Sequence, residues 1–382
     1  PRFCHCSPLV LKERTFLTRI FIFVRPSLRR VSFIISGSDH FYSCPNSVFE
    51  TDYFVHGTLR MKKVFRGLPS PEERLDCAVA IGNFDGVHRG HQALLHEVVE
   101  AAHARLLCPA VLTFEPHPRE FFNPEDAPRR ISSLHDKVEA IEACGIQRVY
   151  ILRFNEHLAS LSPCDFVKEI LVDGLHARWV TVGENFRFGD KRAGDIKLLE
   201  QLGKEFHFEV HPMPMLFHTH APISSSRIRH ALAEGDIPTA NYMLGRPYMI
   251  SGRVLHGKQL GRTLGFPTIN QRILPPHSKA KPAIEGVYAV KAHGIGPRPI
   301  EGVACVGRRP TVDDHGEYLL ETHLFNFHGD LYDQDVKVEF FSKIRDEKKF
   351  GSLGEVRAAI AADQLKAIFF FFKQNTAYDI HR

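Results

Sequence analysis

The sequence lacks several features that would assign it to a specialised class of protein. No run of about 18 apolar residues occurs in its 382 residues, so no membrane-spanning helix and no membrane partner are expected. The eight cysteines include no C-x-x-C pair, which argues against a zinc finger or a redox motif. Hydrophobic residues make up 43% and charged residues 24%, values that argue against collagen and intrinsic disorder. A globular, cytoplasmic protein with reduced thiols is therefore expected.

The net charge of +5 comes from the two ends of the chain. Residues 1–60 carry eight Lys and Arg against four Asp and Glu, whereas residues 61–366 carry 39 of each sign. We interpret residues 1–60, which show no sustained helical or alternating pattern, as an extension upstream of a true start at Met61; a basic targeting leader is the alternative. Residues 367–382, with four consecutive phenylalanines, are expected to form an atypical tail. The neutral middle gives no signal for nucleic-acid binding.

Residues 61–245 alternate short apolar runs with amphipathic segments. The expected strands are Cys77–Ile81, Ala110–Phe114, Arg148–Phe154, Arg178–Val182 and Phe206–Pro212. The expected helices are His91–Leu107, Ser133–Ala143, Ser162–Gly174, Asp195–Leu202 and Ser224–Glu234. This alternation predicts a Rossmann-like α/β domain with a mostly parallel, doubly wound sheet.

The pattern changes near residue 245, and residues 246–366 form a second expected domain. Turn signals there separate segments with partial alternation of apolar and polar residues. The expected strands are Tyr248–Leu255, Gly286–Ala292, Gly302–Val306, Tyr318–Asn326 and Gln334–Phe341. A helix is expected at about Leu353–Leu365. The pattern predicts a small antiparallel β-barrel or sandwich followed by one C-terminal helix.

The strongest local signal is the glycine-rich run GNFDGVHRGH at residues 82–91, between an expected strand and a helix. Open α/β sheets bind nucleotides at such a place, and the amides of a helix N-terminus favour phosphate. His88 and His91, three residues apart, can face one phosphate together, and Gly90 lets that phosphate approach the backbone. A chance pair or a metal-binding pair is the alternative.

Three motifs of the first domain resemble a known family. His88–His91 resembles the HxGH signature of the nucleotidyltransferase superfamily, and Ile223–Arg229 resembles its partner ISSTxxR, with Ser226 in the place of Thr. Together with GENFRFG at Gly183–Gly189, they resemble the FMN adenylyltransferase half of the bifunctional riboflavin kinase/FMN adenylyltransferases. The resemblance implies catalytic roles for His88 and His91. It implies nucleotide or flavin binding by Gly82, Phe84, Asp85, Gly90, Asn185, Ser224, Ser225 and Arg229.

Three alternatives stay open in and near these motifs. Ser224–Ser226 could donate hydrogen bonds to phosphate or cap a helix. Phe186 and Phe188 could stack on flavin or pack in the core. His218 and His220 could be a metal pair, although two loop histidines are the preferred interpretation.

The second domain resembles the riboflavin kinase half of the same family. Gly252–Asn270 resembles the segment that ends in the PTAN motif, with Ile269 in place of Ala. The resemblance implies that Thr268 and Asn270 hold Mg²⁺ with ATP and that Glu321 is the general base. It implies substrate binding by Gly265, Pro267 and Arg345. A Walker A reading of residues 252–259 is rejected, because Gln259 replaces the magnesium-binding Ser or Thr.

The resemblance implies an enzyme that phosphorylates riboflavin to FMN and then transfers an adenylyl group from ATP to FMN, giving FAD and pyrophosphate. Retention of only one activity, or a different nucleotidyltransferase activity, is the alternative. The implied ligands are riboflavin, FMN, FAD and ATP, and the sequence carries no signal for oligomeric state. Asp333 stands where the family commonly has Gly, and we expect a slightly destabilised turn there.

Overall fold

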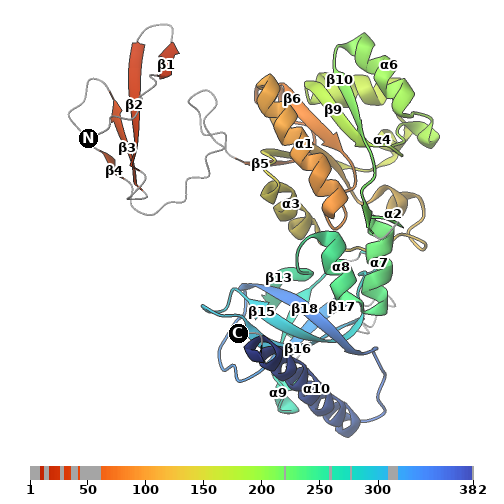
Figure 1. Ribbon diagram of the computed structural model, residues 1–382. Coiled ribbons are helices and arrows are strands. Elements are labelled where there is room, and N and C mark those ends of the chain that lie inside the picture. The colour runs from red at the N-terminus through yellow and green to blue at the C-terminus, as the bar shows by residue number, and fades with distance from the viewer. Residues whose placement is uncertain are drawn as a thin grey trace. The chain divides into compact units, whose positions relative to one another are not determined.

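The computed structural model describes residues 9–12, 17–25, 30–35, 42–43, 62–218, 221–257, 260–275, 278–308 and 317–380 (Figure 1). The chain divides into two compact units, Pro1–Arg60 and Met61–Arg382. The first contains an antiparallel sheet of β1 (Leu9–Lys12), β2 (Leu17–Arg25), β3 (Arg30–Ile35) and β4 (Tyr42–Ser43). No strands were predicted in this region, but Ile, Phe and Val in β2 and β3 favour extended backbone.

The N-terminal half of the second unit is built on one six-stranded parallel sheet, in the order β10-β9-β6-β7-β8-β5. Its strands are β5 (Lys63–Arg66), β6 (Cys77–Ile81), β7 (Cys108–Glu115), β8 (Arg148–Arg153), β9 (Ala177–Gly183) and β10 (Glu209–Met213). The expected doubly wound parallel sheet is confirmed, although β5 was not anticipated. A short hairpin of β11 (Phe217–His218) and β12 (Ala221–Pro222) follows the sheet.

Helices cover both faces of this sheet. The longer ones are α1 (Arg89–Arg105), α3 (Leu134–Ala143), the π-helical η2 (Phe166–Gly174) and α6 (Ile196–Phe206). The shorter ones are η1 (Pro71–Glu73), α2 (Pro118–Phe122), α4 (Glu156–Ser160), α5 (Pro163–Asp165) and η3 (Asp190–Arg192). Alternate residues of β6 enter two separate cores: Ala78 and Ala80 pack with α1 and α3, and Cys77 and Val79 pack with η2 and α6.

The C-terminal half is a closed antiparallel barrel in the order β13-β14-β17-β16-β15-β18. Its strands are β13 (Met249–Leu255), β14 (Thr268–Arg272), β15 (Gly286–His293), β16 (Ile300–Arg308), β17 (Tyr318–Leu324) and β18 (Asp335–Arg345), and a short helix α9 (Leu260–Thr263) precedes β14. The barrel prediction is confirmed, but β14 was missed. The site residues Thr268 and Asn270 lie on this strand.

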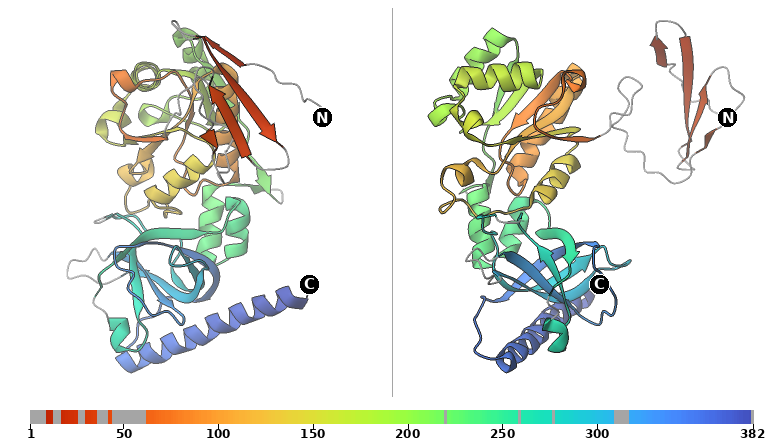
Figure 2. Two further views of the ribbon diagram at one scale, coloured as in Figure 1. Left: turned by 90° about the vertical axis from the view of Figure 1, so that its left-hand side faces the viewer. Right: turned by 180° about the vertical axis from the view of Figure 1, so that it is seen from behind.

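A single long helix, α10 (Leu353–Ile380), lies along the outside of the barrel (Figure 2). It continues through the four phenylalanines, where an atypical tail was expected. Phe371 is only 1% exposed because it packs against Val287, Ala289 and Val303 on the outer barrel wall, and this packing extends the helix. In the described part of the chain, no helix is both long enough and apolar enough to cross a membrane.

Two helices join the halves of the second unit. They are α7 (Ser225–Glu234) and α8 (Ile237–Leu244), of which α8 was not expected. Their apolar residues Ile228, Leu232 and Met243 belong to the same buried cluster as the barrel residues Tyr248 and Phe340. The apolar core is therefore continuous across the expected boundary at residue 245.

Candidate functional site

The strand order places the glycine-rich loop at the topological switch point of the parallel sheet. From β6 the chain proceeds to β7 and β8 on one side, and β9 then pairs on the other side of β6. The loops that leave the carboxyl ends of β6 and β9 therefore flank one crevice, where open α/β sheets bind ligands. These loops are the predicted motifs at residues 82–91 and 183–189.

The first loop has an unusual backbone. Phe84, Gly86 and Val87 have positive φ angles of 50°, 83° and 40°. The Phe84 ring is 1% exposed, and a Cβ atom at Gly82 would meet it at 3.1 Å, so the glycine makes room for the ring. Gly82 and Phe84 thus shape the loop from beneath.

His88 and His91 stack on one another at the start of α1. Their ring centroids are 3.7 Å apart, and a Cβ atom at Gly90 would meet the His88 ring at 3.1 Å. Burial lowers the pKa of His88 to about 4, although the Asp85 carboxylate opposes the shift. Burial and the neighbouring His88 hold the pKa of His91 well below its usual range. Without a ligand, both rings are neutral at pH 7.

The hydrogen bonds of the pair leave polar atoms for a ligand. His88 is the N-cap of α1, and its Nδ1 accepts a hydrogen bond from the backbone N–H of His91 at 3.3 Å. Because Nδ1 accepts, Nε2 of the neutral ring carries the proton and is a donor. Nδ1 of His91 is buried and has no hydrogen-bond partner among the described residues. The pair therefore suits an anion at the helix N-terminus.

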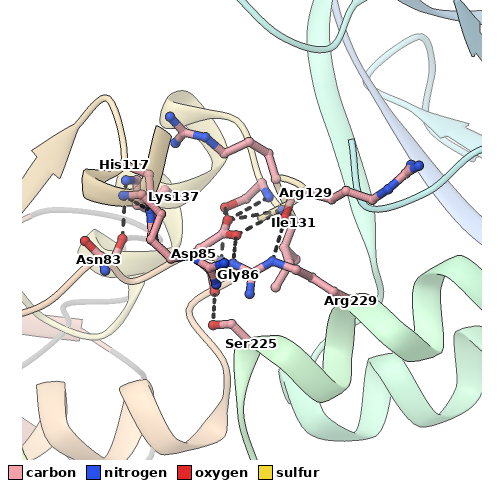
Figure 3. A network of polar contacts seen from close by, with 12 residues as sticks. Asn83, Asp85, Gly86, His117, Arg129, Ile131, Lys137, Ser225 and Arg229 are labelled. Atoms are coloured by element: carbon pink, nitrogen blue, oxygen red, sulfur yellow. Dashed lines mark hydrogen bonds and ion pairs between the residues drawn. The ribbon is translucent and has the colours of Figure 1, made fainter. Parts of the chain in front are cut away.

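A buried ion pair ties this loop to α7 (Figure 3). Arg229 Nη2 donates to the Asp85 carboxylate at 2.7 Å, and Arg229 Nε donates to the carbonyl of Arg129 at 2.6 Å. The same carboxylate accepts from the backbone N–H groups of Ile131 and Ser132 at 3.2 Å. Asp85 and Arg229, predicted as ligand contacts, thus bind one another in this structure.

The serines of α7 divide into two roles. Ser224 is the N-cap, and its hydroxyl accepts from the backbone N–H of Arg227 at 3.4 Å, as in the capping alternative. Ser225 donates its hydroxyl to the Asp85 carbonyl at 3.0 Å. Ser225 therefore fixes α7 against the loop, whereas Ser224 caps α7 itself.

The loop after β9 separates its aromatic residues. Phe188 is 6% exposed and packs with Phe166 in the core, so it fits the packing alternative. Phe186 is half-buried and stacks on Phe188 with ring centroids 5.5 Å apart. Asn185 is exposed, and its amide lies 3.7 Å from Sδ of Met215. His218 contacts the Tyr242 ring at 3.8 Å, and His220 lies outside the described residues.

The kinase-type residues come together on the outer face of the barrel. Asn270 of β14 is paired with Glu321 of β17, and Thr268 is paired with His323. Directly paired residues of antiparallel strands project to the same face, so Thr268, Asn270 and Glu321 share one face. Gln271, the residue after Asn270 on β14, is fully buried and donates to the carbonyls of Gly252 and Val336, both at 2.7 Å.

Glycines allow the backbone to approach these side chains. A Cβ atom at Gly257 would lie 2.7 Å from Nδ2 of Asn270, and one at Gly261 would lie 3.3 Å from the Thr268 hydroxyl. Gly265 has a φ of 86°, and the carbonyl of Pro267 contacts Nδ1 of His323 at 2.8 Å. Both glycines of this approach lie beside the Thr268–Asn270 strand.

The donor set on β14 suits magnesium. A hydroxyl and an amide oxygen on one strand face are hard oxygen donors, which Mg²⁺ prefers, and Mg²⁺ commonly completes its shell with water and substrate phosphates. Among the described residues, no group of three or more His, Cys, Asp or Glu side chains could hold a metal ion by itself. The residues present therefore fit a magnesium ion that arrives with ATP.

Arg345 is anchored to the C-terminal helix. Its Nε and Nη2 atoms donate to the Asp363 carboxylate at 3.0 Å and 2.7 Å, and Asp363 is 4% exposed. Burial raises the pKa of Cys305 to about 12, and the carboxylates of Glu347 and Glu321 add to the shift. Cys305 is paired with Glu321, and a Cβ atom at Gly307 on the same strand would meet the Glu347 carboxylate, so the segment after Arg345 lies near Glu321.

Comparison with known proteins identifies the family. A family model of FAD synthetase matches residues 70–227, and a model of riboflavin kinase matches residues 244–371. The bifunctional riboflavin kinase/FMN adenylyltransferase of Escherichia coli K12 is 41% identical over 313 residues, which cover 81% of this chain and 98% of the relative. The chain belongs to the bifunctional riboflavin kinase/FMN adenylyltransferase family.

Two further proteins are similar over the same share of the chain. The family member from Pseudomonas fluorescens is 43% identical over 303 residues, which cover 79% of this chain and 95% of the relative. A crystal structure described as a macrolide-efflux protein from Streptococcus pneumoniae aligns with a TM-score of 0.61 at 28% identity, covering 79% of this chain and 97% of that one. The family predicted from the motifs is thus confirmed.

One buried charge in the adenylyltransferase-type site was not predicted from the sequence. The side chain of Lys137 is 3% exposed, and its Nζ donates to the Asn83 carbonyl at 3.3 Å and lies 3.8 Å from Glu115. Burial lowers its pKa. Lys137 shares a helix face with Leu134 and Ile141, so a lysine within an apolar stripe was the available signal.

A second ionic cluster borders the same site. Arg130 donates to the Glu115 carboxylate at 2.6 Å and 3.1 Å and also binds Glu120. Burial lowers the pKa of the nearby His117 to about 4, and the positive charge of Arg130 adds to the shift. Together with Lys137, these residues give the crevice a dense set of balanced charges.

Proposed function

We propose that this chain phosphorylates riboflavin to FMN and then joins FMN to the adenylyl group of a second ATP, giving FAD and pyrophosphate. The observation that carries the proposal is the coexistence of two separate sites in one chain: a histidine pair at the switch point of a parallel sheet, and a Thr–Asn–Glu face on a closed barrel. The two family models, in the same order, support it. We assign adenylyl transfer to residues 61–245 and the kinase step to residues 246–366.

In adenylyl transfer, the phosphate of FMN attacks the α-phosphorus of ATP. A new P–O–P bond forms, and the bond to the β-phosphate breaks to release pyrophosphate. The FMN phosphate is already ionised at neutral pH, so the site needs no strong base and acts by positioning and charge stabilisation. Nε2–H of His88, the ring of His91 and the N-terminal amides of α1 hold the transferring phosphate.

The remaining residues of this site set its shape and charge. Gly82, Phe84 and Gly90 shape the loop, Ser224 caps α7, and Ser225 fixes α7 beside the loop. Asp85 holds the Arg229 guanidinium, whose positive charge favours the ATP polyphosphate. Asn185 contacts the nucleotide or the flavin from the opposite loop.

In the kinase step, the 5′-hydroxyl of riboflavin attacks the γ-phosphorus of ATP and ADP leaves. Glu321 accepts the hydroxyl proton. Thr268 and Asn270 would hold Mg²⁺ with the ATP phosphates, and the ion would supply charge neutralisation there. Gly265 and Pro267 approach the phosphates, and Arg345 contacts flavin. The ligands are small molecules, and we propose a cytoplasmic location.

The test is to incubate the full chain with riboflavin, ATP and Mg²⁺ and to resolve the flavins by chromatography. We expect FMN first and FAD later, and FAD directly when FMN is supplied. Formation of neither product would contradict the proposal. FMN from riboflavin with no FAD, or FAD from supplied FMN with no FMN from riboflavin, would limit it to one activity. A parallel reaction with CTP tests for a different nucleotidyltransferase, and we expect no flavin–cytidine product.

A further inference from the structure

The backbone before His88 is held in a conformation that it would not adopt by itself. Val87 has a φ of 40°, although the branched Cβ of valine clashes with the backbone in the left-handed region. Gly86 before it has a φ of 83°. Such a segment persists only where its surroundings determine it, and these angles set the direction in which the His88 ring leaves the chain.

A guanidinium from the other side of the expected domain boundary binds this segment. Arg246 Nη2 donates to the Gly86 carbonyl at 2.8 Å, and Nη1 donates to the Val87 carbonyl at 2.9 Å. Nη1 also lies 3.3 Å from the carbonyl of Leu244, the last residue of α8. Arg246 lies within the riboflavin kinase match, which begins at residue 244.

A glutamine of α1 completes the junction. Nε2 of Gln92 donates to the carbonyls of Val87 at 2.8 Å and Leu244 at 2.7 Å. Gly245 has a φ of 72°, and a Cβ atom there would meet Oε1 of Gln92 at 3.0 Å. The end of α8, the start of α1 and the loop are thus joined through side chains that bind backbone carbonyls.

We propose that Arg246 is a positioning residue for adenylyl transfer, and that it makes the geometry of His88 depend on the junction with the kinase half. The inference rests on the proposed adenylyl transfer. Arg246 acts through Gly86 and Val87, which it binds as a planar, two-pronged donor. A lysine ammonium is a single point of contact and reproduces only part of this arrangement.

The expected consequence is a loss of turnover rather than of substrate binding. When the carbonyls lose their donor, the loop relaxes and the His88 ring moves away from the transferring phosphate. A displacement of about 1 Å at a reacting centre can lower a rate by about 100-fold. Substrate contacts made elsewhere in the crevice remain.

The experiment compares Arg246→Ala, Arg246→Lys and the unsubstituted full chain in two assays, FAD from FMN and ATP, and FMN from riboflavin and ATP. For Arg246→Ala, we expect kcat for FAD formation to fall by about 10- to 100-fold, with little change in KM and an unchanged kinase rate. For Arg246→Lys, the decrease in kcat for FAD formation should be smaller. Arg357→Ala, which removes an exposed arginine of α10, is the matched control and should change neither rate.

Chemical rescue gives a second readout. A cavity of about 260 Å³ adjoins Arg246 and is also lined by Asp136, Glu139, Met249 and Lys337, so a small cation has room to reach the vacated position. We expect millimolar guanidinium, compared with sodium chloride at equal ionic strength, to restore part of the FAD-forming rate of Arg246→Ala. The Arg357→Ala protein should not respond.

Three outcomes would overturn the inference: an unchanged FAD-forming kcat in Arg246→Ala, a parallel loss of both activities in Arg246→Ala and Arg246→Lys, or a rise in KM with kcat preserved. If Arg246→Ala does not fold, Arg246→Lys and its kcat-to-KM comparison decide by the same criteria. Failure of the proposed function is distinguishable, because the unsubstituted chain would then form no FAD from FMN.

Discussion

The two candidate sites of this chain are built in different ways. At the switch point of the parallel sheet, Asp85 and Lys137 are buried and Arg229 is half-buried, and the three bind one another or neighbouring backbone. On the barrel, Thr268 and Glu321 are brought to one face by strand register, and neither is fully buried. The residues of the first site therefore contribute to the stability of their half of the protein. The residues of the second site lie on the outer face of the barrel and contribute little to its stability.

This difference predicts how each site responds to substitution. A buried charge that loses its partner leaves the other charge desolvated, so activity and stability should fall together at the switch point. A half-buried side chain on a strand face contributes little to folding, so the barrel site should lose activity alone.

The largest effect is expected for Glu321→Gln. Removal of the general base should lower the rate of FMN formation by about 100-fold or more, because proton transfer by a positioned side chain contributes about 10²- to 10⁴-fold. The thermal unfolding midpoint and FAD formation from supplied FMN should not change. Glu301→Gln, on the neighbouring strand β16, is the matched control. A lower unfolding midpoint in Glu321→Gln would contradict the prediction that the barrel site loses activity without losing stability.

Asp85→Asn should affect the other site in two ways. It leaves the Arg229 guanidinium, which is 17% exposed, without its anion, so we expect the free energy of unfolding to fall by about 1–3 kcal/mol and FAD formation to fall with it. Urea unfolding and the FAD assay measure the two losses. Asp126→Asn is the control, since that side chain is 83% exposed. Loss of FAD formation at full stability would contradict the coupling.

The pH dependence of stability should also reflect the switch-point site. His88 and His117 have pKa values of about 4 in the folded chain, below the usual 6.5, because burial disfavours their charged forms. Between pH 6.5 and 4 the unfolded chain binds protons that the folded chain does not. As the pH is lowered from 6.5 to 4, the free energy of unfolding should therefore decrease by about 1 kcal/mol per pH unit for each histidine.

Urea unfolding at pH 7 and pH 5 measures this slope. His117→Asn should reduce it, because asparagine keeps the cap of α2 and does not titrate. The exposed His157→Asn is the matched control. An identical slope in His117→Asn and the unsubstituted protein would show that His117 does not contribute.

The smallest effect is expected on the barrel. Asp333 has a φ of 62°, the left-handed conformation that the family glycine would adopt more easily. Asp333→Gly should raise the free energy of unfolding by about 0.5 kcal/mol, since relief of strain is partly offset by greater entropy of the unfolded chain. Thermal unfolding and the kinase rate measure it. If neither the unfolding midpoint nor the kinase rate changes, the proposed strain at Asp333 is contradicted.

Short-range patterns predicted much of this fold. Cys77–Ile81 is a strand at the predicted bounds because a parallel central strand is buried on both faces and reads as one apolar run. The histidine pair was predictable because strand, glycine loop and helix follow each other directly. The sequence left two roles for Ser224, phosphate binding or helix capping, and in the structure Ser224 caps α7.

The missed features depend on contacts between distant segments. The strand Thr268–Arg272 is mostly polar, and its Gln271 is buried only because Gly252 and Val336 accept its amide protons. The helix through Phe371 extends because the barrel wall receives that ring. Arg246 binds a loop about 160 positions earlier, a relation that no local spacing contains.

The continuous apolar cluster of α7, α8 and the barrel also bears on how the protein unfolds. The FAD synthetase match ends at residue 227, inside α7, and the riboflavin kinase match begins at residue 244, the last residue of α8. The two segments that match separate family models therefore do not coincide with the segments that we expect to unfold as units. On heating, α7, α8 and the barrel should unfold in one cooperative transition. This cooperative unit therefore crosses the boundary between the two family matches.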